Sequence, residues 1–200
     1  MKIETIILAG GKSSRMGEDK ALLTIKGKPF ITYICEQVVS FSQNIYIVSP
    51  WVEKYQNLVP TSCVFISESQ SFSGPLSAFA DALEHVTSEW ILLLACDLPY
   101  LNLSTFHNWI ENLSTIDQDN QKAIAFLAPN KKGWECLAGF YHRRCLDSLQ
   151  KYLETEQKSF QDWLKNEQVI PMTIVDYDIF FNCNTPEEYQ KIKVIPNSKI

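Results

Sequence analysis

The sequence lacks several features that would place it in a common class of binding protein. None of its six cysteines forms a Cys-x-x-Cys pair, and its three histidines are dispersed, so no metal-ligand spacing of the zinc type occurs. The formal net charge of -5 comes from charged residues that are spread without long runs, and no broad basic face is indicated. We therefore expect neither general nucleic-acid binding nor attachment to a membrane surface.

Long apolar segments and low-complexity tracts are also missing. The first eleven residues contain Glu4 within their apolar run, and they have too few apolar residues for a signal peptide or a membrane span. Scattered cysteines in such a chain are typical of reduced thiols in a cytosolic protein, so we expect a cytoplasmic location. Because repeats and linkers are absent, residues 1–200 are predicted to form a single domain, with disorder only in the last few residues.

Short apolar, β-branched runs alternate with segments that have helical patterns. Near-continuous apolarity, as in residues 90–95, is typical of strands that are covered on both faces of a sheet. The alternation predicts an α/β fold, a three-layer α/β/α sandwich with a mainly parallel, Rossmann-like nucleotide-binding sheet. The expected strands are 5–9, 45–49, 63–66, 90–95, 123–128 and 169–175, and the expected helices are 30–41, 75–85, 103–113, 143–153, 159–165 and 186–193.

The segment after the first expected strand carries an unusual concentration of positive charge. Gly10 and Gly11 let the backbone approach a ligand closely, and exposed amides in such a loop bind anions. Arg15 and Lys20 add charges that can pair with phosphate oxygens. The Walker pattern fails because Ile6 stands where its first glycine is required, and the dinucleotide pattern Gly-x-Gly-x-x-Gly is absent. The loop therefore predicts a polyphosphate site, and a solvated turn with incidental charges is the alternative.

An acidic residue marks the end of another expected strand. Asp97 follows the apolar segment 90–95, and Pro99 then forces a turn. A carboxylate at the carboxyl end of a buried strand is well placed to hold Mg²⁺, which prefers oxygen ligands and is commonly bound by one or two carboxylates together with substrate phosphates. The alternative role for Asp97 is to cap the following turn.

Two motifs in these segments resemble those of a known enzyme family. L-A-G-G-x-x-x-R-M-G-x-D-K, from Leu8 to Lys20, resembles the signature of nucleotidyltransferases of the molybdenum cofactor guanylyltransferase type, and C-D-x-P-Y around Asp97 resembles their metal site. The resemblance extends to Tyr189. It implies transfer of GMP from GTP to the terminal phosphate of molybdopterin, with release of pyrophosphate and with Mg²⁺ as cofactor. Cofactor-insertion proteins or apo-molybdoenzymes are then the expected protein partners.

The resemblance also implies roles by matching position. Arg15, Lys20 and Asp97 are implied to be catalytic, with Arg15 at the β- and γ-phosphates, Lys20 at the α-phosphate and Asp97 at the metal. Asn182 and Asn184, in a segment similar to the family's N-T-P-E ending, are implied to face the pterin, and Asn184 can also cap the last helix. The implied nucleotide-binding residues are Leu8, Ala9, Gly10, Gly11, Arg15, Lys20, Glu68, Gly74, Pro75 and Asp97.

Base recognition is implied by a third matching segment. Gly74 and Pro75 belong to a G-P-L turn similar to one that the family places against guanine. Glu68 stands near the position where the family usually has an aspartate that reads the base, and its side chain is one methylene longer. Three alternatives to guanylyl transfer stay open, namely transfer of CMP to the same pterin, nucleotidyl transfer to a sugar or polyol phosphate, and a GTP-binding adaptor without turnover.

Overall fold

The computed structural model describes residues 1–11, 16–67, 74–116 and 122–194, and the last few residues, for which disorder was expected, lie outside these ranges. The strands are β1 (Ile3–Leu8), β2 (Thr24–Ile25), β3 (Lys28–Pro29), β4 (Ser42–Val48), β5 (Cys63–Ile66), β6 (Trp90–Ala95), β7 (Ala125–Asn130), β8 (Gly133–His142) and β9 (Val169–Pro171). The helices are α1 (Phe30–Val38), α2 (Val52–Tyr55), α3 (Pro75–Leu83), α4 (Leu103–Ile116), α5 (Leu146–Leu153), α6 (Phe160–Leu164) and α7 (Pro186–Val194), with 3₁₀ turns η1 (Lys20–Leu22), η2 (Arg143–Cys145) and η3 (Tyr177–Phe180).

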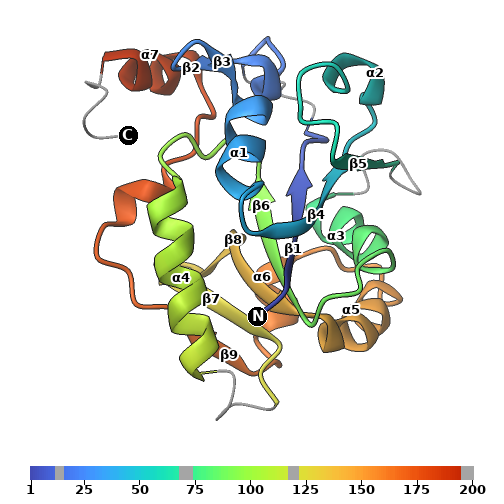
Figure 1. The fold of residues 1–200 in the computed structure, drawn as a ribbon. Helices are drawn as coiled ribbons and strands as arrows, with labels where there is room; N and C mark the ends of the chain where they lie inside the picture. Colours follow the sequence, from blue (N-terminus) through green and yellow to red (C-terminus); the bar gives the residue numbers. More distant parts are fainter. Residues whose placement is uncertain (12–15, 68–73, 117–121, 195–200) are drawn as a thin grey trace.

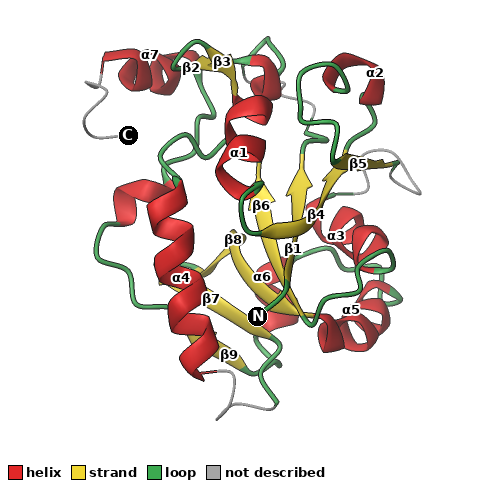
Figure 2. Cartoon of the chain, in the orientation of Figure 1, coloured by secondary structure: helices red, strands yellow, loops and turns green. Residues whose placement is uncertain are grey.

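A seven-stranded sheet organises the chain in the order β5-β4-β1-β6-β8-β7-β9 (Figures 1 and 2). The strands β5, β4, β1 and β6 are parallel to one another, and β7 is parallel to β9. Only β8 runs against its neighbours β6 and β7 in this sheet. The predicted α/β fold with a mainly parallel central sheet is therefore confirmed.

Helices cover both faces of the sheet and produce the three-layer arrangement (Figure 1). Ile7 and Leu92 pack in the core layer that contains α1 and α4. Their neighbours in sequence, Ile6 and Leu93, pack in the layer that contains α3, α5 and α6. Because successive side chains point to opposite faces, a strand that is covered on both sides must be apolar at every position, which explains the continuous apolar runs.

The longest strand of the sheet is one that the sequence pattern did not predict. β8 has 10 residues and forms a hairpin with β7 through a tight turn at Lys131 and Lys132. Gly133 follows this turn with φ of 128°, a backbone conformation that side chains with a Cβ rarely adopt. The β2–β3 hairpin was also unpredicted, and the expected strand 169–175 ends at Pro171 instead.

The carboxyl-terminal segment returns to the region around η1. Cys183 and Ile192 pack with Leu23, Ile25 and other residues of a third apolar cluster. The side chain of Tyr189 bonds to the backbone of Thr24 at 3.0 Å. This packing brings residues near position 184 to the carboxyl edge of the sheet. Within the described ranges, no helix has both the length and the apolar character that crossing a membrane requires.

Candidate active site

A pocket of about 530 Å³ lies at the carboxyl ends of β1, β4 and β6. This is the edge of an open α/β sheet where ligands ordinarily bind. The register of the sheet pairs Leu8 of β1 with Ala95 of β6, so the loops that follow these two strands start side by side. The pocket is lined by Leu8, Ala9, Gly10, Gly11, Asp19, Lys20, Ala21, Val48, Gly74, Pro75, Ala78, Ala95, Cys96, Asp97 and Leu137.

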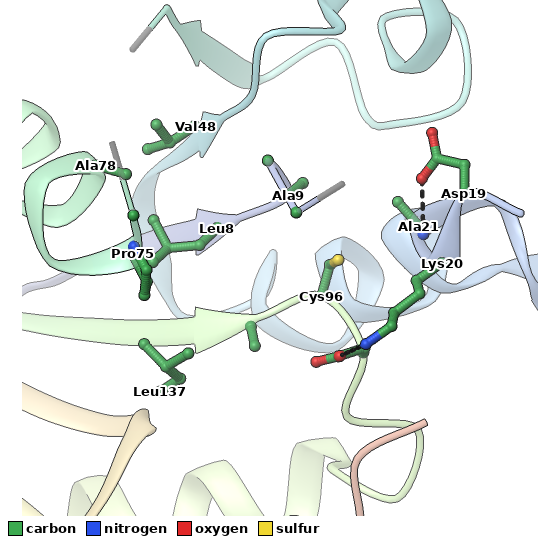
Figure 3. A pocket seen from close by; sticks show the side chains of 15 residues that line it. Leu8, Ala9, Asp19, Lys20, Ala21, Val48, Pro75, Ala78, Cys96 and Leu137 are labelled. Atoms are coloured by element: carbon green, nitrogen blue, oxygen red, sulfur yellow. Dashed lines mark hydrogen bonds and ion pairs between the residues drawn. The ribbon is translucent and has the colours of Figure 1, made fainter. Parts of the chain in front are cut away.

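The lining divides into an apolar end and a charged end (Figure 3). The apolar end is made by side chains from several elements, which are Leu8, Val48, Pro75, Ala78 and Leu137. Asp19 and Lys20 lie at the other end, where Lys20 contacts Asp97, and Ala9 and Cys96 lie between the two ends. A ligand that fits both ends has an apolar or aromatic part and an anionic part, as a nucleotide does.

Lys20, Asp97 and Asn184 form a polar cluster at the charged end. Lys20 Nζ donates to Asp97 Oδ2 at 3.1 Å and to Asn184 Oδ1 at 2.5 Å. The side chains of Lys20 and Asp97 are 20% and 16% exposed, so the ion pair is partly shielded from solvent but open to the pocket. Two residues that were predicted to be catalytic are thus brought into contact with each other, and Lys20 also contacts an amide oxygen from a segment 164 residues away.

The structure separates the two roles considered for Asn184. The first turn of α7 is capped by Thr185, whose hydroxyl accepts from the amide of Glu188 at 3.2 Å, while the Glu188 carboxylate accepts from the amides of Asn184 and Thr185. This reciprocal arrangement is a capping box. The side-chain oxygen of Asn184 accepts from Lys20 instead, so this side chain does not cap the helix, and its contact with the pterin stays a prediction.

A backbone bond also holds this segment against the acidic loop. The amide of Cys183 donates to the carbonyl of Asp97 at 3.2 Å. Burial raises the pKa of the Cys183 thiol to about 11, and the nearby Asp97 carboxylate adds to this shift. Burial likewise raises the pKa of the Cys96 thiol, with Asp97 as a further cause, so this thiol stays protonated near neutral pH.

The turn before α3 presents backbone and helix end to the pocket. Gly74 has φ of 105°, and Pro75 occupies the first turn of the helix, where its fixed φ is favourable. Both residues line the pocket, as the sequence suggested. The amino-terminal end of a helix carries exposed amides and partial positive charge, which favour an electron-rich ligand.

The structure places most of the other predicted site residues. Leu8, Ala9, Gly10 and Gly11 all line the pocket. Asn182 is exposed and is not part of the pocket lining. Arg15 and Glu68 lie outside the described residues, as does the rest of segments 12–15 and 68–73.

The structure adds residues to the site that the sequence analysis did not identify. Asp19 lines the pocket and accepts a hydrogen bond from the backbone amide of Ala21 at 3.2 Å, which caps η1. An acidic residue directly before a short helical segment is a recognisable capping signal. Val48, Ala78 and Leu137 come from elements whose relative position depends on the tertiary fold, so no local signal marks them as lining residues.

The cysteines and the acidic side chains of the described residues are dispersed. No group of three or more histidine, cysteine or acidic side chains that could hold a metal ion occurs in that part of the chain. All six cysteines are free thiols, as expected. Oxygen donors at the charged end include the carboxylates of Asp97 and Asp19 and the amide of Asn184.

Comparison with known proteins agrees with this arrangement. The sequence model of the MobA-like NTP transferase domain matches residues 5–170. A probable molybdenum cofactor guanylyltransferase from Nostoc sp. is 44% identical over 191 residues, which cover 96% of this chain and 90% of the relative. A probable molybdenum cofactor guanylyltransferase from Synechococcus elongatus is 35% identical, with coverage of 97% and 100%.

Solved structures share the fold at lower sequence identity. The molybdopterin-guanine dinucleotide biosynthesis protein A from Archaeoglobus fulgidus superposes with a TM-score of 0.76 at 19% identity, over 96% of each chain. The 4-diphosphocytidyl-2C-methyl-D-erythritol synthase from Anaerococcus prevotii superposes with a TM-score of 0.68 at 15% identity, over 96% of this chain and 94% of the other. The shared fold thus spans proteins that are named for different products. The sequence match over most of the chain, together with the pocket at the ends of β1 and β6, shows that this chain belongs to the MobA-like NTP transferase family.

Proposed function

We propose that this protein transfers GMP from GTP to the terminal phosphate of molybdopterin, forming molybdopterin guanine dinucleotide and pyrophosphate. The observation that carries the proposal is the contact of Lys20 with Asp97 and Asn184 at the charged end of a pocket whose other end is apolar. The printed names of the relatives from Nostoc sp. and Synechococcus elongatus support the choice of nucleotide and acceptor.

The two ends of the pocket suit the two parts of GTP. The base lies against the apolar side chains of Leu8 and Val48 and against the turn at Gly74 and Pro75. The triphosphate extends toward Lys20, past the backbone of Gly10 and Gly11, where amide donors bind phosphate oxygens. Arg15 steadies the pyrophosphate that leaves, and Glu68 reads the base.

The reaction is an in-line attack of the pterin phosphate on the α-phosphorus of GTP. Both reactants are anionic, so alignment and neutralisation of charge supply most of the acceleration. Lys20 donates to an oxygen of the α-phosphate and offsets the negative charge that develops there. Asn184 accepts from the Lys20 ammonium and so holds it at the site. The protein supplies no nucleophile.

The donor set at Asp97 fits Mg²⁺. A single carboxylate with a neighbouring amide oxygen, completed by phosphate oxygens and water, is a common magnesium environment. When bound, the ion would neutralise phosphate charge and polarise the phosphorus centre. Asp97 would hold the ion, while the contact of Lys20 with Asn184 keeps the ammonium next to the same phosphates.

The proposal is tested by measuring pyrophosphate release. Purified protein is incubated with Mg²⁺, a molybdopterin-loaded carrier protein and each of the four nucleoside triphosphates in turn. Release with GTP alone is expected, and a Lys20→Ala variant should release almost none. Release with CTP in place of GTP would identify a cytidylyltransferase. No release with any triphosphate and this acceptor would refute the proposed function, and a Lys20→Ala variant near wild-type activity would refute the assigned role of Lys20.

A further inference from the structure

The connection between β4 and α2 contacts the end of β1 through Ser49. Ser49 is fully buried, and its hydroxyl donates to the carbonyl of Ala9 at 3.0 Å while accepting from the amide of Trp51 at 3.1 Å. The amide of Ala9 in turn donates to the carbonyl of Val48 at 2.9 Å. These bonds anchor the backbone at the point where the segment after β1 leaves the sheet.

The same connection reaches the far side of this loop through Tyr55. Tyr55 is fully buried, and its hydroxyl donates to Asp19 Oδ2 at 2.7 Å. Tyr55 is joined to Ser49 through the chain, because Trp51, whose amide donates to the Ser49 hydroxyl, directly precedes α2. Burial raises the pKa of Tyr55, and the adjacent Asp19 carboxylate adds to this shift, so the hydroxyl keeps its proton and acts as the donor to Asp19.

Asp19 converts this contact into a constraint on Lys20. Its second oxygen, Oδ1, accepts from the amide of Ala21 at 3.2 Å and so fixes the start of η1, whose first residue is Lys20. Lys54 lies 3.8 Å from Asp19 Oδ2, but its side chain is 52% exposed, and such a pair contributes little. The buried Tyr55 hydroxyl is therefore the principal partner of Asp19 from α2.

We propose that Tyr55, supported by Ser49, is a positioning residue that sets the place of Lys20 relative to the carboxyl end of β1. It acts through Asp19 and touches neither phosphate nor acceptor. Ser49 at one end of segment 49–55 contacts Ala9, before residues 12–15, and Tyr55 at the other end contacts Asp19, which fixes the turn that begins at Lys20. The effect on turnover rests on the proposed function, whereas the effect on local structure does not.

The chemistry of Tyr55 distinguishes positioning from simple packing. Phenylalanine fills almost the same space, and a hydroxyl that is buried without a partner costs free energy. The hydroxyl is instead bonded to a carboxylate, and hydrogen bonds with a charged partner are roughly twice as strong as neutral ones. Helix α2 has only 4 residues and is too short to be stable by itself, so its place depends on anchors such as Tyr55.

The test compares Tyr55→Phe with Tyr46→Phe. Tyr46 is a buried tyrosine of β4. Its hydroxyl donates to Glu4 Oε1 at 3.2 Å and to the His85 carbonyl at 3.1 Å, and none of these residues lines the pocket. The two variants thus make the same chemical change. Both should melt at a lower temperature than wild type, which controls for loss of stability.

The readouts are kcat and KM for GTP and the exchange of the Ala21 amide. A shift of about 1 Å in a catalytic group can cost about 100-fold in rate, so Tyr55→Phe should lower kcat roughly 10- to 100-fold while Tyr46→Phe stays within about twofold of wild type. Hydrogen–deuterium exchange in the peptide containing Ala21 should accelerate in Tyr55→Phe and not in Tyr46→Phe. An Asp19→Ala variant should lose as much activity as the Asp19→Ala and Tyr55→Phe double variant, because the two residues act in series.

The outcomes separate this inference from the proposed function. Unchanged exchange at Ala21 in Tyr55→Phe would overturn the inference whether or not the protein transfers GMP. Accelerated exchange with unchanged kcat and KM would overturn the link to Lys20. Absence of turnover in the wild-type protein would refute the proposed function, and the exchange measurement would still decide whether Tyr55 holds η1.

Discussion

Replacing Asn184 with alanine tests whether the carboxyl-terminal segment takes part in nucleotidyl transfer. The change removes the oxygen that accepts from Lys20 Nζ at 2.5 Å and leaves the capping box of Thr185 and Glu188 in place. A hydrogen bond with a charged partner contributes about 1.5–3 kcal/mol. The Lys20 side chain is 20% exposed, so solvent recovers part of this and the lower half of the range applies.

The expected loss follows directly from that range. About 1.5–2 kcal/mol corresponds to a decrease of roughly 10- to 30-fold in rate. We expect this decrease in kcat/KM for GTP, because Lys20 loses the contact that holds it at the α-phosphate. Pyrophosphate release is measured at varied GTP with a saturating concentration of molybdopterin-loaded carrier, and thermal unfolding confirms that the variant is folded.

Asn182→Ala is the matched control, since it makes the same change two residues away at an exposed side chain. It should leave kcat/KM for GTP within about twofold of wild type. If Asn184→Ala raises KM for the pterin and leaves kcat/KM for GTP unchanged, then Asn184 serves the acceptor alone and the role assigned to its contact with Lys20 is wrong.

Three further predictions concern stability and thiol reactivity. Burial raises the pKa of Glu4, but hydrogen bonds from four neighbours outweigh burial and place this pKa below 4.5. Glu4→Gln should therefore lower the free energy of unfolding by about 2–3 kcal/mol at pH 7. In urea unfolding, the difference from wild type should shrink as the pH falls below 4.5, through the pKa of Glu4 in the folded state. The interaction between Cys35 and Cys63 lowers the pKa of the Cys63 thiol and raises the pKa of the Cys35 thiol. Iodoacetamide should therefore label the partly exposed Cys63 first. Faster labelling of Cys35, as followed by mass spectrometry, would contradict this. A Cβ at Gly139 would lie 2.6 Å from Leu127 Cδ2, so Gly139→Ala should lower stability by about 1–3 kcal/mol, and an unchanged melting temperature would contradict the packing.

The sequence predicted those parts of the site that depend on strand ends. Lys20 and Asp97 are 77 residues apart, yet each follows an apolar run that forms a parallel strand of the sheet. Parallel neighbours end at the same edge, so residues that follow them meet there without further information. The apolar continuity of β1 and β6 and the glycines after β1 indicated these loops as the place of a site, and the resemblance to the family implied the roles of Lys20 and Asp97.

The sequence could not predict contacts between elements that no apolar pattern marks as neighbours. The pairing of β8 between β6 and β7 depends on a tight hairpin, and its residues mix charged and apolar types rather than forming a continuous apolar run. Tyr55 and Asp19 meet because a four-residue helix docks beside η1, and a tyrosine on a short helix has no pattern that distinguishes an anchor from a packed aromatic side chain.

The carboxyl-terminal segment takes part in the site through its hydrogen bonds to Lys20 and Asp97. The MobA-like match ends at residue 170, but Asn184 and Cys183 supply bonds to Lys20 and to Asp97, the two residues on which transfer is proposed to depend. If Lys20 were paired only with the Asp97 carboxylate, the attraction between the two charges would hold it. The more strongly charged triphosphate could then draw the ammonium away from Asp97. The neutral amide oxygen of Asn184 keeps a hold on the ammonium without reducing its charge, so Lys20 can exchange Asp97 for a phosphate oxygen and remain in place. The segment beyond residue 170 is therefore part of the catalytic apparatus that we propose.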